Sequence, residues 1–259
     1  MEADLVCLDG SLVEASAALI PVTDHGLLRG DGVFEAVRLY AGVPYALDAH
    51  MERMERSAAG LRLPLDAAAL RADVARLIAA RPGLDVLVRI VLTRGGHRIV
   101  LLEELREMPA SLALEPVTYA PTRLLDGIKS LSYAANMLAS QLAREQGADD
   151  ALLVTPHGRV LELPTSSFFV VLDGEVWTAP LSEHVLDSIT RRVVAAVTAL
   201  REEPIALDAL AGAQEAFIAG TPYEVVAVHR VGPHDYDAPG PRTREIAAAV
   251  RERIAAELR

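Results

Sequence analysis

The chain has 259 residues, a net charge of −11 and 51% hydrophobic residues, so it can bury a substantial core in one large or two medium domains. The acidic balance excludes a non-specific nucleic-acid binder, because such proteins need a surplus of Lys and Arg for the phosphates. The single cysteine, Cys7, excludes an internal disulfide, and no apolar run is long enough to span a bilayer, so we expect a cytoplasmic protein with no membrane partner.

The first half of the chain is predicted to hold three pairs of strands and two helices. Apolar runs lie on both sides of three turn-forming dipeptides, Asp9-Gly10, Ala41-Gly42 and Gly95-Gly96, which is typical of antiparallel hairpins. Segments 48–60 and 65–80 repeat their apolar residues at helical spacing and are predicted to be helices.

The chain is expected to divide into an N-terminal domain, residues 1–117, and a C-terminal domain, residues 127–259, joined by a linker at 118–126. Prolines and a change in composition mark this junction. The C-terminal part is predicted to contain strands, a helix capped by Ser188 and a final helix that starts near Pro241. Strands and helices mix without a βαβ repeat, so we predict an α+β fold.

Three common kinds of site are excluded by the motifs. The glycines of "RGDGVFEA" match neither the dinucleotide-binding fingerprint nor the P-loop. The histidines show no metal-binding spacing and one cysteine cannot form a thiolate cluster, so no metal is expected. The Gly-x-Ser-x-Gly elbow of serine hydrolases does not occur.

One lysine, Lys129, stands among 24 arginines. Arginine keeps its proton, whereas a desolvated lysine can lose it and act as a nucleophile. Alone, the residue is equally well explained as a solvated surface lysine. A pyridoxal 5′-phosphate (PLP) enzyme would need such a lysine, a carboxylate for the pyridine nitrogen and an anion site. The start of "ITRRVVAAV", at Ile189 and Thr190, is a helix N-terminus suited to a phosphate.

Several segments resemble, in their order and spacing, the motifs of the class IV (fold type IV) PLP-dependent aminotransferases. They are "RGDGVFEAVRLYAGVPYALDAHMERMERSA", "IKSLSYAANMLASQLAREQGADDALLV", "GRVLELPTSSFFVV", "VLDSITRRVV" and "FIAGTPYEVVAV". The family includes branched-chain and D-amino-acid aminotransferases and aminodeoxychorismate lyases, and the resemblance covers nearly the whole chain. It implies a two-domain α+β architecture with PLP between the domains, and a homodimer.

The resemblance also implies roles for individual residues. Lys129 is implied as the Schiff-base lysine, Glu162 as the carboxylate on the pyridine nitrogen, and Tyr133 as the partner of the cofactor's phenolic oxygen. The implied phosphate site consists of Arg53, Ile189, Thr190 and Thr221.

Each of these residues has a structural interpretation as well. Arg53 could lie on a solvated helix face and pair with Glu52 and Glu55. Glu162 could be an outward-facing residue of a strand. The motifs taken together favour the functional interpretation.

The substrate side departs from the family's pattern. The loop after "LTRGG" lacks the Arg-x-His pair of the D-amino-acid enzymes and the Arg-Gly-Tyr run of the lyases, so another cation must bind a substrate carboxylate. We expect Arg29 and Arg89 to do so, near Phe34. The alternative for Arg89 is a pair with a structural carboxylate such as Glu35.

Smaller departures concern the cofactor side. Ser132 and Ser167 stand where many members carry asparagine, and Ser188 replaces a common glycine. These changes indicate small shifts in hydrogen bonding to PLP.

The expected reaction is transfer of an amino group between an α-amino acid, most consistently a D-amino acid, and a 2-oxo acid. It would follow a ping-pong scheme through the Lys129 Schiff base. The main alternative is an aminodeoxychorismate lyase, which releases pyruvate and 4-aminobenzoate without an acceptor. Transamination of (R)-amines and a PLP-binding protein without catalysis are further alternatives.

Overall fold

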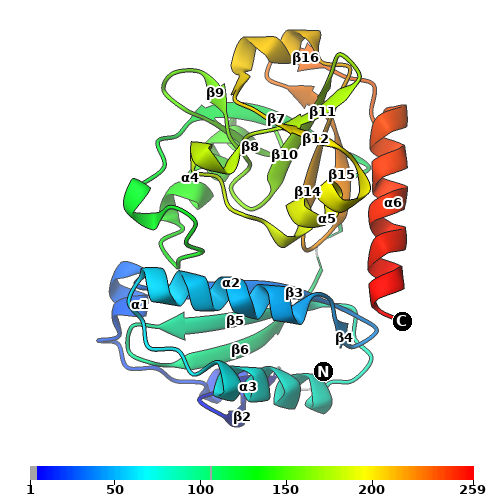
Figure 1. The fold of residues 1–259 in the computed structure, drawn as a ribbon. Helices are drawn as coiled ribbons and strands as arrows, with labels where there is room; N and C mark the ends of the chain where they lie inside the picture. The colour runs from blue at the N-terminus through cyan, green and yellow to red at the C-terminus, as the bar shows by residue number, and fades with distance from the viewer. Residues whose placement is uncertain (1–4, 106) are drawn as a thin grey trace. The chain divides into compact units, whose positions relative to one another are not determined.

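The computed structural model describes residues 5–105 and 107–259, which form two compact units (Figure 1). Unit 1 comprises Met1–Arg106 and Ile128–Tyr133, and unit 2 comprises Glu107–Gly127 and Ala134–Arg259. No helix in the described part of the chain combines the length and the apolar character that a bilayer span requires.

Unit 1 contains a six-stranded antiparallel sheet with the strand order β2-β1-β6-β5-β3-β4. Its predicted hairpin turns at Asp9-Gly10, Ala41-Gly42 and Gly95-Gly96 are confirmed, since each joins two paired strands. The strands are β1 (Leu5–Leu8), β2 (Ser11–Glu14), β3 (Gly32–Tyr40), β4 (Val43–Pro44), β5 (Leu87–Thr93) and β6 (Arg98–Glu103).

The helices of unit 1 are α1 (His25–Arg29), α2 (Leu47–Gly60) and α3 (Ala67–Ala80). Helices α2 and α3 confirm the two predicted from apolar spacing, and their buried residues pack with one face of the sheet in a single core. That face carries Val33, Glu35 and Val37 of β3, because alternate strand residues point to the same side. The opposite face carries Phe34, Arg38 and, on β5, Arg89.

The segment around Lys129 belongs to unit 1 although its neighbours in sequence belong to unit 2. The Phe34 amide donates to the Lys129 carbonyl at 3.1 Å, and the Leu131 amide donates to the Gly32 carbonyl at 2.9 Å. These bonds attach the segment to β3. Residues 128–133 were expected in the C-terminal domain but lie in unit 1. Residues 107–117 were expected in the N-terminal domain but lie in unit 2.

Unit 2 contains a ten-stranded mixed sheet with the order β12-β11-β10-β14-β15-β7-β8-β9-β13 and with β16 paired to β15. Pairs β7–β8, β15–β7 and β11–β12 are parallel. The strands are β7 (Ser111–Thr118), β8 (Asp150–Val154), β9 (Arg159–Val160), β10 (Ser167–Leu172), β11 (Glu175–Thr178), β12 (Leu200–Glu202), β13 (Ile205–Ala206), β14 (Glu215–Gly220), β15 (Glu224–Val231) and β16 (His234–Asp235).

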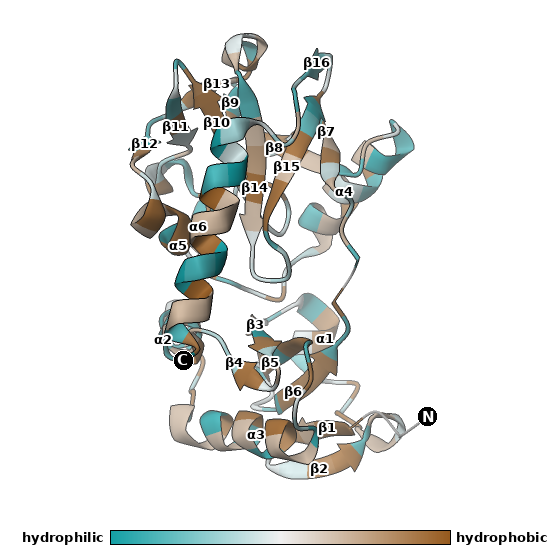
Figure 2. Cartoon of the chain, turned by 90° about the vertical axis from the view of Figure 1, so that its right-hand side faces the viewer, coloured by the Kyte–Doolittle hydropathy of each residue, from teal (hydrophilic) through white to brown (hydrophobic). Residues whose placement is uncertain are grey.

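Helices α4 (Ala134–Glu145), α5 (Ile189–Val197) and α6 (Pro241–Glu257) accompany this sheet. Short 3₁₀ segments lie at Ala15–Ala17, Arg123–Leu125, Leu181–Glu183 and Leu207–Gly212. Figure 2 shows hydrophobic and hydrophilic bands alternating along α6, and its apolar residues Ile246, Val250 and Ile254 are buried. Their spacing of four places them on one face of the helix.

The start of α6 is capped from a distant strand. Its N-cap residue, Gly240, offers no side chain, and the buried carboxylate of Glu215 on β14 accepts the Arg242 amide at 2.9 Å and the Thr243 amide at 2.7 Å. The Thr243 hydroxyl donates to the same carboxylate at 2.7 Å. A Cβ at Gly240 would lie 2.1 Å from Glu215 Cδ, so this close approach requires glycine.

Replacement of Glu215 by alanine is expected to lower the free energy of unfolding by about 2 kcal/mol, because it removes a charged cap and leaves buried amides unpaired. Urea unfolding at pH 7 measures the change. Glu252→Ala, at an exposed position of α6, is the control and should change stability by less than about 0.5 kcal/mol. An equal effect of the two substitutions would contradict the capping role.

Candidate active site

Lys129 lies over aromatic rings of unit 1. Its Nζ is 4.4 Å from the centre of the Phe34 ring and 5.6 Å from that of Tyr133. The two rings meet edge to face, with centres 5.1 Å apart. The Lys129 amide donates to the hydroxyl of Ser57 on α2 at 3.1 Å. Backbone bonds to β3 and α2 therefore fix the main chain, and Phe34 and Tyr133 direct the amine.

The guanidinium of Arg89 also contacts the Phe34 ring. Its Cζ is 5.1 Å from the centre of Phe34. It forms a two-bond pair with Glu103 of β6, with Nε to Oε1 at 2.6 Å and Nη2 to Oε2 at 2.8 Å. The partner is not Glu35, because Ala36 is opposite Arg89 and Glu35 therefore points to the other face. The structure thus brings Phe34, Arg89, Lys129 and Tyr133 together.

Arg53 pairs with Glu35 in the core beneath the sheet. Glu35 accepts Arg53 Nε at 2.6 Å, Arg53 Nη2 at 2.7 Å and contacts His50 Nδ1 at 2.8 Å. All three side chains are buried, so Arg53 is not on a solvated face of α2. Arg53 and Ser57, which contacts Lys129, are one helical turn apart on α2.

The charges of this cluster balance within the core. Burial favours the neutral form of Glu35, but the hydrogen bonds and charge of Arg53, and then of His50, outweigh it and lower the pKa of Glu35 to about 2. Burial lowers the pKa of His50, and the charges of Arg53 and Lys129 act in the same direction. Glu35 is thus an ionised partner for Arg53, and His50 is neutral.

Arg29 is the last residue of α1 and is exposed. It forms no ion pair within residues 5–105 and 107–259. The structure does not place it in contact with Phe34 or Arg89.

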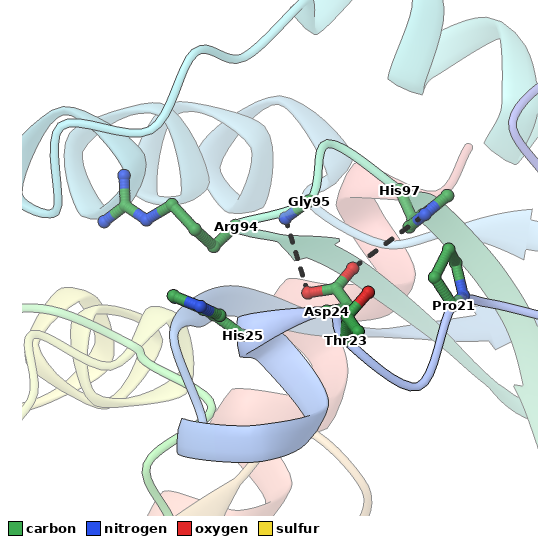
Figure 3. A pocket seen from close by; sticks show the side chains of 7 residues that line it. All are labelled: Pro21, Thr23, Asp24, His25, Arg94, Gly95 and His97. Carbon is green, nitrogen blue, oxygen red and sulfur yellow. Dashed lines mark hydrogen bonds and ion pairs between the residues drawn. The ribbon is translucent and has the colours of Figure 1, made fainter.

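A pocket lies beside α1, between the segment before this helix and the loop that joins β5 to β6. Figure 3 shows the side chains that line it, which are Pro21, Thr23, Asp24, His25, Arg94, Gly95 and His97. Asp24 is buried and accepts the Thr93 hydroxyl at 2.6 Å and the Gly26 amide at 2.6 Å.

The polar groups of this pocket hold the loop in place. Burial would raise the pKa of Asp24, but hydrogen bonds from Thr93, Gly26 and Gly95 lower it. Arg94 is engaged by both carboxylate oxygens of Asp31, at 2.9 and 3.0 Å. The bonds of Asp24 and Asp31 therefore attach the loop between β5 and β6 to the start of α1 and to the residue before β3. This is the loop that lacks the Arg-x-His pair.

In unit 2, Glu162 is joined to the start of α5. Its Oε1 accepts the Leu186 amide at 2.9 Å, and the Ser188 amide donates to the Leu186 carbonyl at 2.8 Å. Strand β9 ends at Val160, but the Glu162 carbonyl still accepts the Leu153 amide at 2.9 Å, so the segment remains extended along β8. Burial, and then the charge of Glu162, raises the pKa of Tyr119.

The predicted N-cap of α5 is confirmed. The Ser188 hydroxyl accepts the Arg191 amide at 3.3 Å. The amides of Ile189 and Thr190 are in the first turn, where a helix offers donors without an intrahelical partner. A nine-residue helix such as α5 adds a favourable dipole for an anion at this end. Thr221 lies in the turn between β14 and β15.

No group of three or more metal-ligating side chains occurs among the residues that the structure describes. Unit 1 instead holds an amine on aromatic rings and two paired arginines. Unit 2 holds a carboxylate that accepts a backbone amide just before helix α5.

The model of the class IV aminotransferases matches residues 32–231. The chain belongs to the class IV aminotransferase family. The match includes Lys129, Glu162 and the start of α5, and it confirms the family inferred from the motifs.

Relatives from two activity groups resemble this chain. A protein of Methanocaldococcus jannaschii, named provisionally as a branched-chain-amino-acid aminotransferase, is 32% identical and 87% of each chain is covered. The D-alanine aminotransferase of Bacillus licheniformis is 28% identical over 97% of this chain and 98% of that one. Both relatives are aminotransferases, one named for branched-chain amino acids and the other for D-alanine.

Solved structures agree on the fold. The fold IV transaminase CpuTA1 of Curtobacterium pusillum has a TM-score of 0.88 and 27% identity, with 99% of this chain and 100% of that chain covered. A branched-chain aminotransferase of Thermoproteus uzoniensis has a TM-score of 0.91 and 27% identity, with 98% and 96% covered. The predicted fold type IV architecture is confirmed.

The sequence does not predict the two carboxylates that contact these arginines. Glu35 pairs with Arg53 and not with Arg89, and Glu103 pairs with Arg89. No local sequence signal identifies Glu103, because its contact with Arg89 depends on the register of β5 against β6.

Replacement of Glu35 by glutamine is expected to lower the free energy of unfolding at pH 7 by about 3 kcal/mol, because it leaves the buried Arg53 charge without an anion. The pKa of Glu35 falls from an ordinary 4.5 to about 2 on folding. Its stabilisation is therefore present above pH 4.5 and is lost as the pH falls toward 2.

The difference between wild type and Glu35→Gln should accordingly shrink as urea unfolding is repeated at lower pH. Glu55→Gln, on the exposed side of α2, serves as the control. A difference that stays constant from pH 7 to pH 3 would show that the charge of Glu35 is not what stabilises the core.

Proposed function

We propose that this class IV aminotransferase depends on PLP and moves the amino group of a D-amino acid to a 2-oxo acid in a ping-pong cycle, with Lys129 as the lysine that carries the cofactor. The supporting observation is the placement of the sole lysine of the sequence over Phe34 and Tyr133, with its main chain bonded to β3 and α2.

The residues fit PLP in their chemistry. One observation that supports the fit is the Ser167 hydroxyl, which is buried without a hydrogen-bond partner in the described part of the chain. A buried hydroxyl of this kind needs a partner, which a polar ligand would supply. Ser167 is opposite Ala219 in the β10–β14 ladder, two residues before Thr221.

Each proposed cofactor contact has a distinct task. The Glu162 carboxylate would hold the proton on the pyridine nitrogen, and Tyr133 would donate to the phenolic oxygen. The positive charge of Arg53, the Thr221 hydroxyl and the amides at the start of α5 would bind the phosphate.

When bound, PLP supplies an electron sink for the negative charge that develops at the substrate's α-carbon. The amine of Lys129, in its neutral form, would take the proton from that carbon and return it on the way to product. Phe34 and Tyr133 would keep the amine in a narrow range of positions, which favours proton transfer at a single carbon.

We further propose that Arg89 and Arg29 bind the substrate carboxylate. Arg89 is on the same ring as the Lys129 amine, and its Nη1 has no partner among the described residues, since Glu103 engages Nε and Nη2. Arg29 is exposed and unpaired in the described chain. Relatives named as D-alanine aminotransferases support the D-amino-acid assignment.

A second candidate is transamination of branched-chain amino acids. It is favoured by the relative at 32% identity and by the Thermoproteus uzoniensis structure, whose title names norvaline. The activity would reside in a homodimer, as the family resemblance implies, and in the cytoplasm, as the single cysteine predicts.

Reduction of the PLP-loaded protein with borohydride is expected to fix the cofactor on the one peptide that contains Lys129. Mass spectrometry of the digest identifies the labelled residue. Lys129→Ala should keep its fold, lose the label and lose all amino transfer. A label on another residue, or full activity of the variant, would refute the role of Lys129 as the lysine that carries the cofactor.

Replacement of Arg89 or Arg29 by leucine is expected to raise KM for D-alanine about ten- to a hundredfold, because a charge-assisted hydrogen bond is worth about 1.5–3 kcal/mol. KM for (R)-1-phenylethylamine, which lacks a carboxylate, should stay within about twofold. Steady-state rates with and without a 2-oxo acid test this and also detect a lyase, which would turn over without the acceptor. Equal losses for both substrates would reject the carboxylate role.

A further inference from the structure

We propose that Glu103 determines how strongly the site prefers substrates with a carboxylate over amines that lack one, because it already neutralises the arginine that would bind the carboxylate. This inference rests on the role proposed above for Arg89. It adds a specificity-determining residue from β6, a strand with no other proposed site residue.

The pair is fixed by the sheet. Strands β5 and β6 are antiparallel, with Arg89 opposite Leu101 and Leu87 opposite Glu103. Arg89 and Glu103 are therefore diagonal neighbours on one face, within reach of long side chains. Two parallel bonds, at 2.6 and 2.8 Å, hold the guanidinium side-on. Both side chains are about one-third exposed, at 32% and 33%, so a ligand can reach them.

The pair and the reacting amine share one aromatic ring. Arg89 Cζ is 5.1 Å and Lys129 Nζ is 4.4 Å from the centre of the Phe34 ring. A substrate that reaches the Lys129 amine and extends along this ring toward β5 would meet the open edge of Arg89. Any anion on that edge would also be near the carboxylate of Glu103.

Two opposing effects follow from Glu103. Its negative charge repels a substrate carboxylate, and its two bonds restrict the motion of Arg89. The contact of Arg89 with Phe34 does not involve Glu103, so part of the positioning survives its loss. Repulsion between like charges at such short range is therefore the larger effect on carboxylate binding.

For amines that lack a carboxylate, Glu103 has the opposite effect and favours binding. A guanidinium without an anion beside an apolar group is costly, and Glu103 removes this cost because Arg89 stays paired when no carboxylate arrives. The pair thus lets the site accept amines, at the expense of affinity for carboxylates. Removal of the charge should move the two substrate classes in opposite directions, which general damage to the fold would not do.

Calorimetry measures the binding of propionate, an unreactive carboxylate, to the PLP-loaded protein and to the apoprotein. Steady-state kinetics give KM for D-alanine and for (R)-1-phenylethylamine. Glu103→Gln keeps the shape and removes the charge. We expect propionate to bind about tenfold more tightly, which is about 1.4 kcal/mol. KM should fall about tenfold for D-alanine and rise severalfold for the amine.

Glu175→Gln is the matched control. Glu175 accepts a bond from Arg201 at 2.7 Å, and Arg201 lies 4.6 Å from the centre of the Trp177 ring, so this pair reproduces the chemistry in unit 2. It should change none of the measured constants. The double variant Arg89→Leu/Glu103→Gln should show no gain in propionate affinity.

The variants separate the two proposals. If Arg89→Leu binds propionate as the wild type does, Arg89 is not the carboxylate site and the proposed function is wrong on this point. If Arg89→Leu weakens propionate binding but Glu103→Gln leaves it unchanged, or weakens it, the role of Glu103 is overturned and that of Arg89 stands.

Discussion

The attachment of the Lys129 segment to strand β3 is the constraint on which the rest of the site depends. Backbone bonds from Phe34 to Lys129 and from Leu131 to Gly32 hold the segment along the strand. The same strand presents Phe34, the ring over which the amine lies, so a single element fixes both the backbone and the side-chain direction of the lysine. The proton transfer proposed for Lys129 needs this degree of positioning.

Charge compensation organises the two faces of the first sheet differently. On the covered face, the buried Glu35 ionises because Arg53 and His50 outweigh its desolvation, and Arg53 can remain in the core as a cation. On the other face, Arg89 and Glu103 are paired but partly exposed, so they can respond to a ligand. The first pair keeps Arg53 charged inside the protein, as the phosphate role proposed for it requires, and the second is suited to discrimination among substrates.

Much of the fold, and the cap of helix α5, could be predicted from the sequence, because the signals are local. Turn dipeptides such as Asp9-Gly10 and the Ser188 cap specify their own conformation. The partner of Arg89 could not be predicted, since the register of β3 against β5 decides that Arg89 and Glu35 point to opposite faces. The cap of α6 by Glu215 likewise joins residues distant in sequence. The roles proposed for Arg29, Thr221 and the other ligand-contacting residues stay predictions.

The most direct test of the account is the half-reaction of the PLP-loaded enzyme with single amino acids, followed by the change in cofactor absorbance as the amino group is transferred. A panel of D- and L-alanine, D- and L-leucine and D- and L-glutamate compares both stereochemistry and side chain. The account predicts that the D-amino acids react and that Lys129→Ala shows no change with any of them. Faster reaction of L-leucine than of every D-amino acid would contradict it and would favour a branched-chain enzyme.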